Sequence, residues 1–250
     1  MSQTILITGA TSGFGEACAR CFAARGWRLI LTGRRGERLQ ALQKELHPAV
    51  IEVLTLDVRD RQQVMARLSQ LPQVDVLLNN AGLALGLEPA WEVNLDDWDT
   101  MIDTNVKGLT YCTRAVLPQM VARDSGHVVN ISSTAGSWPY SGGNVYGGSK
   151  AFVDQFSRNL RADLYGTRIR VTCIAPGMAE SEFSDVRFKG DKDKAAKVYE
   201  GTEPLRPEDI AEAVYWAVSR PAHVNINAME IMPVAQTWAP LAVHRRKTGQ

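Results

Sequence analysis

The sequence lacks any feature that would direct the chain to a membrane or to nucleic acid. Its 28 basic and 27 acidic residues leave a net charge of +1, so no strong positive field draws it to phosphate backbones or anionic lipids. The apolar run at residues 5–7 is far too short for a signal peptide, and no stretch approaches the length of a membrane span. We therefore expect a soluble cytoplasmic protein whose partner is a small molecule, not a nucleic acid or a membrane.

Cysteine is also scarce, with four residues in the chain. Cys18 and Cys21 have the C-x-x-C spacing of redox motifs and of half a zinc site. A redox pair usually begins a helix, whereas these thiols fall inside a predicted one. A zinc site needs a second ligand pair, which Cys112 and Cys173 do not form. We interpret all four as small buried hydrophobic residues and expect no metal site.

What the sequence does have is a regular alternation of short apolar runs and amphipathic segments. The predicted strands cover residues 4–8, 27–32, 50–56, 74–78, 127–131, 168–174 and 228–232. The predicted helices cover residues 16–25, 38–46, 62–71, 95–123, 145–164 and 207–218. Nearly continuous apolar strands that alternate with helices predict an α/β fold, a doubly wound parallel sheet of the Rossmann type, in a single domain over residues 1–250.

A glycine-rich loop separates the first predicted strand from the first predicted helix. Gly9, Gly13 and Gly15 follow a G-x-x-x-G-x-G spacing, which departs from the common dinucleotide fingerprint. The physical effect is similar, because missing side chains let the backbone and the helix N-terminus approach a pyrophosphate. The residues of this loop that we expect to bind a dinucleotide are Gly9, Thr11, Ser12, Gly13, Phe14 and Gly15.

The end of the second predicted strand carries two arginines where an adenosine ribose should lie. NAD-binding chains usually offer an acidic residue at this point. Here the chain has Arg34 and Arg35, with no acidic residue before Glu37, and arginine suits a 2′-phosphate. The sequence therefore favours NADP as the cofactor, against the alternative that these are solvated surface arginines. Asp57 and Val58 follow the third predicted strand, and we expect them near the adenine ring.

A Tyr-x-x-x-Lys step, Tyr146 to Lys150, falls in the predicted helix 145–164. Residues four apart share one face of a helix, so this spacing places a phenol beside an ammonium group. Because a nearby cation favours the phenolate, we expect Lys150 to lower the pKa of Tyr146 and so to create a proton-transfer site. The same spacing also occurs where tyrosine only packs and lysine reaches solvent. The upstream glycine loop favours the catalytic interpretation.

These motifs together resemble the short-chain dehydrogenase/reductase family. The resemblance rests on the TGATSGFG loop at 8–15, the NNAG turn at 79–82, Asn105, the spacing of Ser133, Tyr146 and Lys150, and Pro176-Gly177. It covers nearly the whole chain, and the motifs are specific in this order. It implies an oxidoreductase that acts on CH–OH groups.

The resemblance also implies a role for each residue. Tyr146 would be the acid/base, Ser133 would hydrogen-bond the reacting oxygen, and Lys150 would hold the nicotinamide ribose. Asn105 would support a proton relay through water. We choose Ser133 over Ser132 because the family's serine stands thirteen residues before the tyrosine, and because neighbouring side chains of an extended segment point to opposite faces. Further cofactor contacts are expected at Asn80, Pro176, Gly177 and Ser181, the last of which replaces the threonine of many members.

The C-terminal third narrows the resemblance to NADP-dependent 3-hydroxy acid dehydrogenases. Residues 183–191 and 221–227 are similar to those of enzymes that oxidise serine, allo-threonine and 3-hydroxyisobutyrate. Residues 177–206 fall where the family places a substrate lid. In this lid Arg187 or Lys189 could meet the substrate carboxylate, and the alternative is that both are solvated charges.

Several alternatives share parts of this pattern. A broad-specificity carbonyl reductase or a 3-oxoacyl-carrier reductase would carry the same catalytic motifs, although the latter usually has a glycine-rich final strand, which residues 227–232 lack. A sensor that binds NADP without turnover would tolerate loss of the tyrosine or lysine, and a structural scaffold would need none of the motifs. Family members commonly pair their two long helices, so we expect a homotetramer, in which the tail at 234–250 either crosses an interface or frays.

Overall fold

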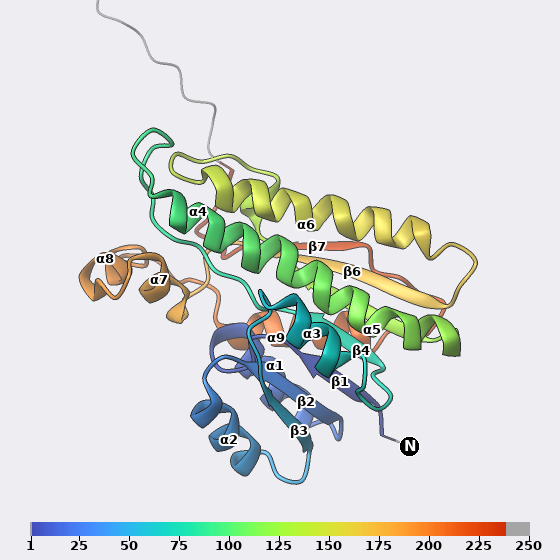
Figure 1. Ribbon diagram of the computed structural model, residues 1–250. Helices are drawn as coiled ribbons and strands as arrows, with labels where there is room; N and C mark the ends of the chain where they lie inside the picture. The colour runs from blue at the N-terminus through green and yellow to red at the C-terminus, as the bar shows by residue number, and fades with distance from the viewer. Residues whose placement is uncertain (1, 239–250) are drawn as a thin grey trace, which may run out of the picture.

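A parallel seven-stranded sheet forms the centre of residues 2–238, the part of the chain that the computed structural model describes (Figure 1). The strand order is β3-β2-β1-β4-β5-β6-β7, so the chain builds the sheet outward from β1 in one direction and then from β4 in the other. The direction changes where β1 and β4 pair as neighbours. The strands are β1 (Thr4–Ile7), β2 (Arg28–Gly33), β3 (Val50–Thr55), β4 (Val76–Asn79), β5 (Gly126–Ile131), β6 (Ile169–Pro176) and β7 (Ala228–Ile231).

Helices cover both faces of this sheet. One face carries α1 beside α9, together with α2, and the opposite face carries α3, α5 and α6 (Figure 1). This arrangement confirms the predicted doubly wound α/β fold. The helices are α1 (Gly13–Ala23), α2 (Gly36–Glu45), α3 (Arg61–Leu68), α4 (Leu95–Ile102), α5 (Leu109–Arg123), α6 (Asn144–Asp163), α7 (Glu182–Arg187), α8 (Lys192–Lys197) and α9 (Pro207–Val218).

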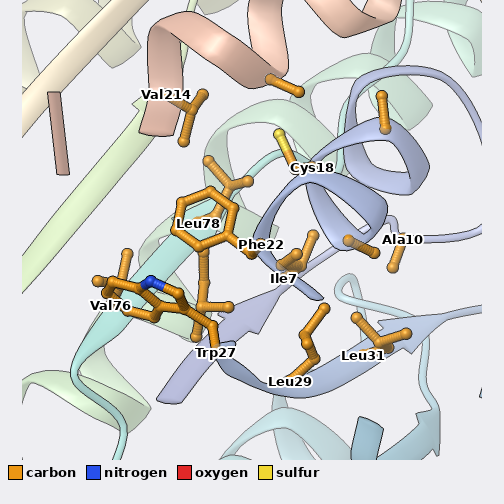
Figure 2. Packing of buried hydrophobic residues seen from close by; sticks show 14 of the residues in the cluster. Ile7, Ala10, Cys18, Phe22, Trp27, Leu29, Leu31, Val76, Leu78 and Val214 are labelled. Carbon is orange, nitrogen blue, oxygen red and sulfur yellow. The ribbon is translucent and has the colours of Figure 1, made fainter. Parts of the chain in front are cut away.

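The two faces hold separate hydrophobic clusters because successive strand residues point to opposite sides. In β1, Ile7 joins the cluster under α1 and α9, whereas Leu6 joins the cluster under α3 and α5. Figure 2 shows the first cluster, in which Phe22 of α1 meets the Trp27 ring edge-on, with centroids 5.1 Å apart. Cys18 packs in the same cluster. Of the four free cysteines, only Cys21 is not fully buried.

One predicted helix, residues 95–123, is interrupted in the structure. A π-helical turn, Asp103–Gly108, separates α4 from α5. At its end Gly108 packs against Val58, where an added Cβ would lie 2.6 Å from a methyl carbon. The turn brings Asn105 into the buried interior, next to the end of β4.

Two short helices, α7 and α8, lie within the predicted lid at residues 177–206. They stand apart from the two layers that flank the sheet (Figure 1). Ser181 and Asp191 cap them, with side-chain oxygens that accept hydrogen bonds from the N–H groups of Phe183 and Lys194. The predicted tail lies outside the described residues from position 239 onward. Within residues 2–238, no helix combines the length and apolar character that a bilayer crossing requires.

Candidate active site

The glycine loop joins β1 to α1 in a tight turn at the carboxyl edge of the sheet. Gly9 has a φ of +68°, and a Cβ there would lie 2.9 Å from Ala81 Cα. A Cβ on Gly15 would collide with the Gly9 carbonyl oxygen. Ser12 is the N-cap of α1 but makes no side-chain capping bond, so the N–H groups of the first turn are not capped by a side chain. Uncapped N–H groups at a helix start bind anions.

Thr8 and Asn80 fix this loop to the end of β4. Thr8 Oγ1 accepts hydrogen bonds from the backbone N–H groups of Asn80 and Ala81, each at 3.0 Å. In return Asn80 Nδ2 donates to the carbonyl oxygens of Thr8 at 2.9 Å and Gly9 at 3.2 Å. Asn80 therefore holds the backbone of the loop in place as well as lining the cavity beside it.

A cavity of about 280 Å³ extends from the glycine loop to Tyr146 and Lys150 of α6. It brings together most of the residues predicted to bind a cofactor. Gly15 packs behind the loop, and Pro176 and Gly177 line a second cavity that shares residues with the first. The predicted residues that line the first cavity are Gly9, Thr11, Ser12, Gly13, Phe14, Arg34, Arg35, Asp57, Val58, Asn80, Tyr146, Lys150 and Ser181.

Arginines gather at the end of the first cavity nearest β2. Arg35 donates from Nε to Thr11 Oγ1 at 3.1 Å and from Nη2 to Ser12 Oγ at 2.7 Å. Its Nη1 pairs with Glu182 of α7 at 2.8 Å, and Arg38 Nη1 pairs with the other carboxylate oxygen at 2.6 Å. Arg38 and Glu182 were not among the residues predicted from the sequence. They are separated by 144 positions, and no local pattern links them.

The other predicted residues of this end have different surroundings. Arg34 and Asp57 both line the cavity, and Asp57 also pairs with Arg59 at 2.7 Å. Burial would raise the pKa of Asp57, but its hydrogen bonds with Arg59 outweigh burial and lower it. Asp57 is therefore ionised at the rim of the cavity.

Tyr146 and Lys150 lie on α6 with their side chains buried, 8% and 6% exposed. Lys150 Nζ donates to the Ile131 carbonyl oxygen at 3.0 Å and lies 5.8 Å from the centroid of the Tyr146 ring. Burial lowers the pKa of Lys150 to about 8, although Cys173 and Asp154 act in the opposite direction. The helix thus places the two groups side by side, as the spacing predicted.

The pKa of Tyr146 differs from the expectation. Burial raises it to about 12, and neither the hydrogen bond with Ser133 nor the nearby charge of Arg187 offsets this effect. The cation that acts on the phenol is Arg187, whose guanidinium carbon lies 5.1 Å from the ring centroid. The phenol is therefore protonated at neutral pH.

The two adjacent serines face different surroundings. Ser132 is buried and donates to the Lys150 carbonyl oxygen at 3.1 Å. Ser133 donates to the Pro176 carbonyl oxygen at 3.4 Å, and its hydroxyl also hydrogen-bonds Tyr146. The structure thus brings Ser133, rather than Ser132, to the phenol.

Asn105 is buried beside this group and uses its whole carboxamide in hydrogen bonds. Its Oδ1 accepts from the Leu83 N–H at 2.9 Å, and its Nδ2 donates to the Leu83 carbonyl at 2.8 Å and to Ser149 Oγ at 3.0 Å. These bonds tie α6 to the loop after β4. A role of Asn105 in a water relay stays a prediction.

Arg187 projects from the end of α7 onto Tyr146. Its guanidinium carbon also lies 5.5 Å from the centroid of the Phe183 ring, and its Nη2 donates to Tyr140 Oη at 2.6 Å. Its Nε is buried and has no hydrogen-bond partner among the described residues. Arg187, Tyr140, Ser133 and Tyr146 all line the second cavity, of about 370 Å³. A buried unpaired N–H beside a phenol suits an anionic group of a ligand.

Lys189, the other candidate for a carboxylate contact, has a different partner. Its Nζ pairs with Asp97 of α4 at 2.7 Å, and its side chain is 58% exposed. It does not line either cavity.

The described residues also contain no group of three or more acidic, histidine or cysteine side chains that could hold a metal ion.

Known proteins resemble this chain over almost all of its length. The NADP-dependent 3-hydroxy acid dehydrogenase YdfG of Salmonella typhi is 61% identical over 246 residues, which cover 96% of this chain and 99% of that protein. The sulfoacetaldehyde reductase 2 of Chromohalobacter salexigens is 53% identical over 251 residues, 98% of this chain and 100% of that protein.

A solved structure shows the same fold. It is the closed form of serine dehydrogenase complexed with NADP⁺, with a TM-score of 0.95 and 57% identity, and the match covers 98% of this chain and 100% of that one. Residues 3–192 also match the family described as short chain dehydrogenase. The glycine loop, the Tyr146–Lys150 pair and these matches agree, and the chain belongs to the short-chain dehydrogenase family.

Proposed function

We propose that this enzyme transfers a hydride between NADP and the 3-hydroxyl of short 3-hydroxy acids, and in reverse reduces the matching carbonyl compounds. One observation carries the substrate class. Arg187 and Tyr146 line the same cavity, with the guanidinium carbon 5.1 Å from the centroid of the phenol ring, so one ligand could meet both side chains. The relatives named for 3-hydroxy acids and for serine support the same class.

The residues that line the first cavity fit NADP. Gly9 and Gly13 leave room at an uncapped helix start for a pyrophosphate, and Arg34 and Arg35 offer positive charge at the β2 end for a 2′-phosphate. Val58 would lie near the adenine, and Lys150 at the inner end would hold the nicotinamide ribose. When bound, the nicotinamide supplies or accepts the hydride.

Side chains of the protein itself transfer the proton. The Tyr146 phenol, with its pKa raised to about 12, is protonated at neutral pH and can donate its proton to a carbonyl oxygen as that carbonyl is reduced. In the oxidative direction the residue acts in its phenolate form, which accepts the proton of the substrate hydroxyl and becomes the phenol again. Ser133, hydrogen-bonded to Tyr146, would hold the reacting oxygen in line with the phenol.

Arg187 would bind the substrate's carboxylate. Charge-assisted hydrogen bonds to a guanidinium are about twice as strong as neutral ones, and more so in a site that excludes water. The ring centroids of Phe183 and Tyr140 lie 5.5 Å and 5.8 Å from the guanidinium carbon. A sulfonate carries the same charge, which is consistent with the relative named sulfoacetaldehyde reductase.

Residues 177–206, which include α7 and α8, would form the substrate lid.

We also propose a homotetramer, because α4, α5 and α6 expose large apolar side chains that a second copy could cover, including Leu95 at 65%, Val121 at 46% and Phe152 at 38%. A cytoplasmic location is supported by four cysteines that are free.

Comparison of an acid with its methyl ester tests this proposal. With NADP, kcat/KM for 3-hydroxyisobutyrate should exceed that for its methyl ester, and Arg187→Met should abolish most of that preference while keeping activity on neutral carbonyls. We expect a loss of about tenfold or more for the acid, since a charge-assisted hydrogen bond contributes roughly 1.5–3 kcal/mol.

The control is Lys189→Met, which removes a cation of the same lid that pairs with Asp97 instead of lining the cavity. It should keep the acid preference. Equal use of acid and ester by the wild-type enzyme would point to a broad-specificity carbonyl reductase. A preference that persists in Arg187→Met would place the anion site elsewhere.

A further inference from the structure

Glu182 stands at the start of α7, where the lid reaches the arginines beyond β2. Its two carboxylate oxygens accept separate hydrogen bonds, from Arg35 at 2.8 Å and from Arg38 at 2.6 Å. Burial alone would raise the pKa of Glu182, but the hydrogen bonds from both arginines outweigh burial and lower it. The carboxylate is therefore ionised at neutral pH and neutralises part of the positive charge at this end of the cavity.

Of these two arginines, Arg35 lines the cavity where a 2′-phosphate would bind, and Arg38 is joined to it through their shared partner Glu182. Arg35 and Glu182 both line the first cavity, at its β2 end. Arg35 already donates from Nε and Nη2 to Thr11 and Ser12, so Nη1 is the nitrogen through which it meets a further partner. In the structure that partner is Glu182.

We propose that Glu182 sets the preference between phosphorylated and unphosphorylated nucleotides by competing with the 2′-phosphate for Arg35 and Arg38. The inference rests on the proposed use of NADP. A phosphate dianion and a carboxylate repel each other at hydrogen-bond range, so the phosphate displaces Glu182 when it takes over the arginines. Arg38 then becomes part of the phosphate site, beside Arg34 and Arg35.

The unphosphorylated nucleotide does not require this exchange. A 2′-hydroxyl is neutral and leaves the two ion pairs with Glu182 in place. The lid contacts at the other end of α7, between Arg187 and Tyr146, are common to both nucleotides. Glu182 therefore affects the ratio of the two affinities rather than the binding of nucleotides in general.

Calorimetric titration with NADP⁺ and with NAD⁺ tests the proposal without relying on turnover. In Glu182→Gln, which keeps the size of the side chain and removes its charge, NADP⁺ should bind about three- to tenfold more tightly at low salt, the range expected from releasing two partly exposed ion pairs. The dissociation constant for NAD⁺ should change less than about twofold, since no phosphate competes there.

The matched control is Glu180→Gln, the same change of charge two residues earlier in the lid, at an exposed side chain. It should leave the NADP⁺/NAD⁺ affinity ratio unchanged. An unchanged ratio in Glu182→Gln, or an equal rise in Glu180→Gln, would overturn the competition. An equal loss of affinity for both nucleotides in Glu182→Gln would also overturn it, because the ion pairs of Glu182 would then stabilise the closed lid rather than compete with the phosphate. If the wild type binds NAD⁺ as tightly as NADP⁺, the proposed use of NADP fails first.

Discussion

Replacing Lys150 by methionine is expected to stabilise the folded protein while removing its activity. Lys150 is 6% exposed, and burial lowers its pKa from 10.5 to about 8. At about 1.36 kcal/mol for each pKa unit, this difference destabilises the fold by about 3 kcal/mol at pH 7. Loss of the hydrogen bond to the Ile131 carbonyl subtracts about 1 kcal/mol from the gain. The variant should therefore be more stable by about 2 kcal/mol.

The pH dependence has a definite sign. Below pH 8 the folded and unfolded chains both carry the protonated lysine, so the destabilisation is complete. As pH rises from about 8 to 10.5 the folded protein loses this proton while the unfolded chain keeps it, and the destabilisation fades. The stability advantage of Lys150→Met should thus be largest near pH 7 and about 2 kcal/mol smaller at pH 9.5.

Guanidinium unfolding, followed by tryptophan fluorescence at both pH values, measures these quantities. The control is Lys44→Met on α2, an exposed lysine whose replacement should change stability by less than about 0.5 kcal/mol. A Lys150→Met variant that is less stable than the wild type at pH 7 would refute the reasoning. An equal advantage at both pH values would show that methionine packing, not removal of a buried charge, causes the gain.

Three further variants test the catalytic and cofactor residues. Tyr146→Phe should reduce kcat by about 10²–10⁴-fold and leave the dissociation constant for NADP⁺ nearly unchanged, because only the proton-transfer group is lost; more than a tenth of wild-type activity would contradict this mechanism, and Ser133→Ala should have a smaller effect. Joint replacement of Arg34 and Arg35 by alanine should raise the KM for NADP by about one to two orders of magnitude and barely change NAD kinetics. Steady-state kinetics with both nucleotides measure this effect. A ratio of kcat/KM for NADP to kcat/KM for NAD that is the same in the double variant and the wild type would contradict the assignment.

The sequence was sufficient to predict the sheet and the helices that flank it, because the patterns that mark these elements are local. A proline at the first turn and an apolar period of 3.6 mark α9, and the structure has it at Pro207–Val218, as predicted. The π-helical turn Asp103–Gly108 was not predicted. It accompanies a contact between Gly108 and Val58, and because these two residues are far apart in the sequence, no local pattern marks the turn. The lid helix α7 was missed although Ser181 is a regular N-cap, because six residues carry too little periodicity.

The chemistry of the site was predictable in its residues but not in its electrostatics. The spacing of Tyr146 and Lys150 predicted that the two groups are neighbours, and they are. The predicted fall in the pKa of Tyr146 is wrong, because burial depends on the whole fold and outweighs the neighbouring charge. The pairing of Arg38 with Glu182 likewise depends on where α7 docks.

The hydrogen bonds between Thr8 and Asn80 have a consequence for the engineering of coenzyme preference. They fix the Gly9 end of the glycine loop to β4 without using any atom of β2. Residues after β2 can therefore be exchanged while this part of the loop keeps its shape. Changing the coenzyme would then require substitutions after β2 and at Glu182, which pairs with Arg35, whereas the Gly9 end of the loop could stay as it is.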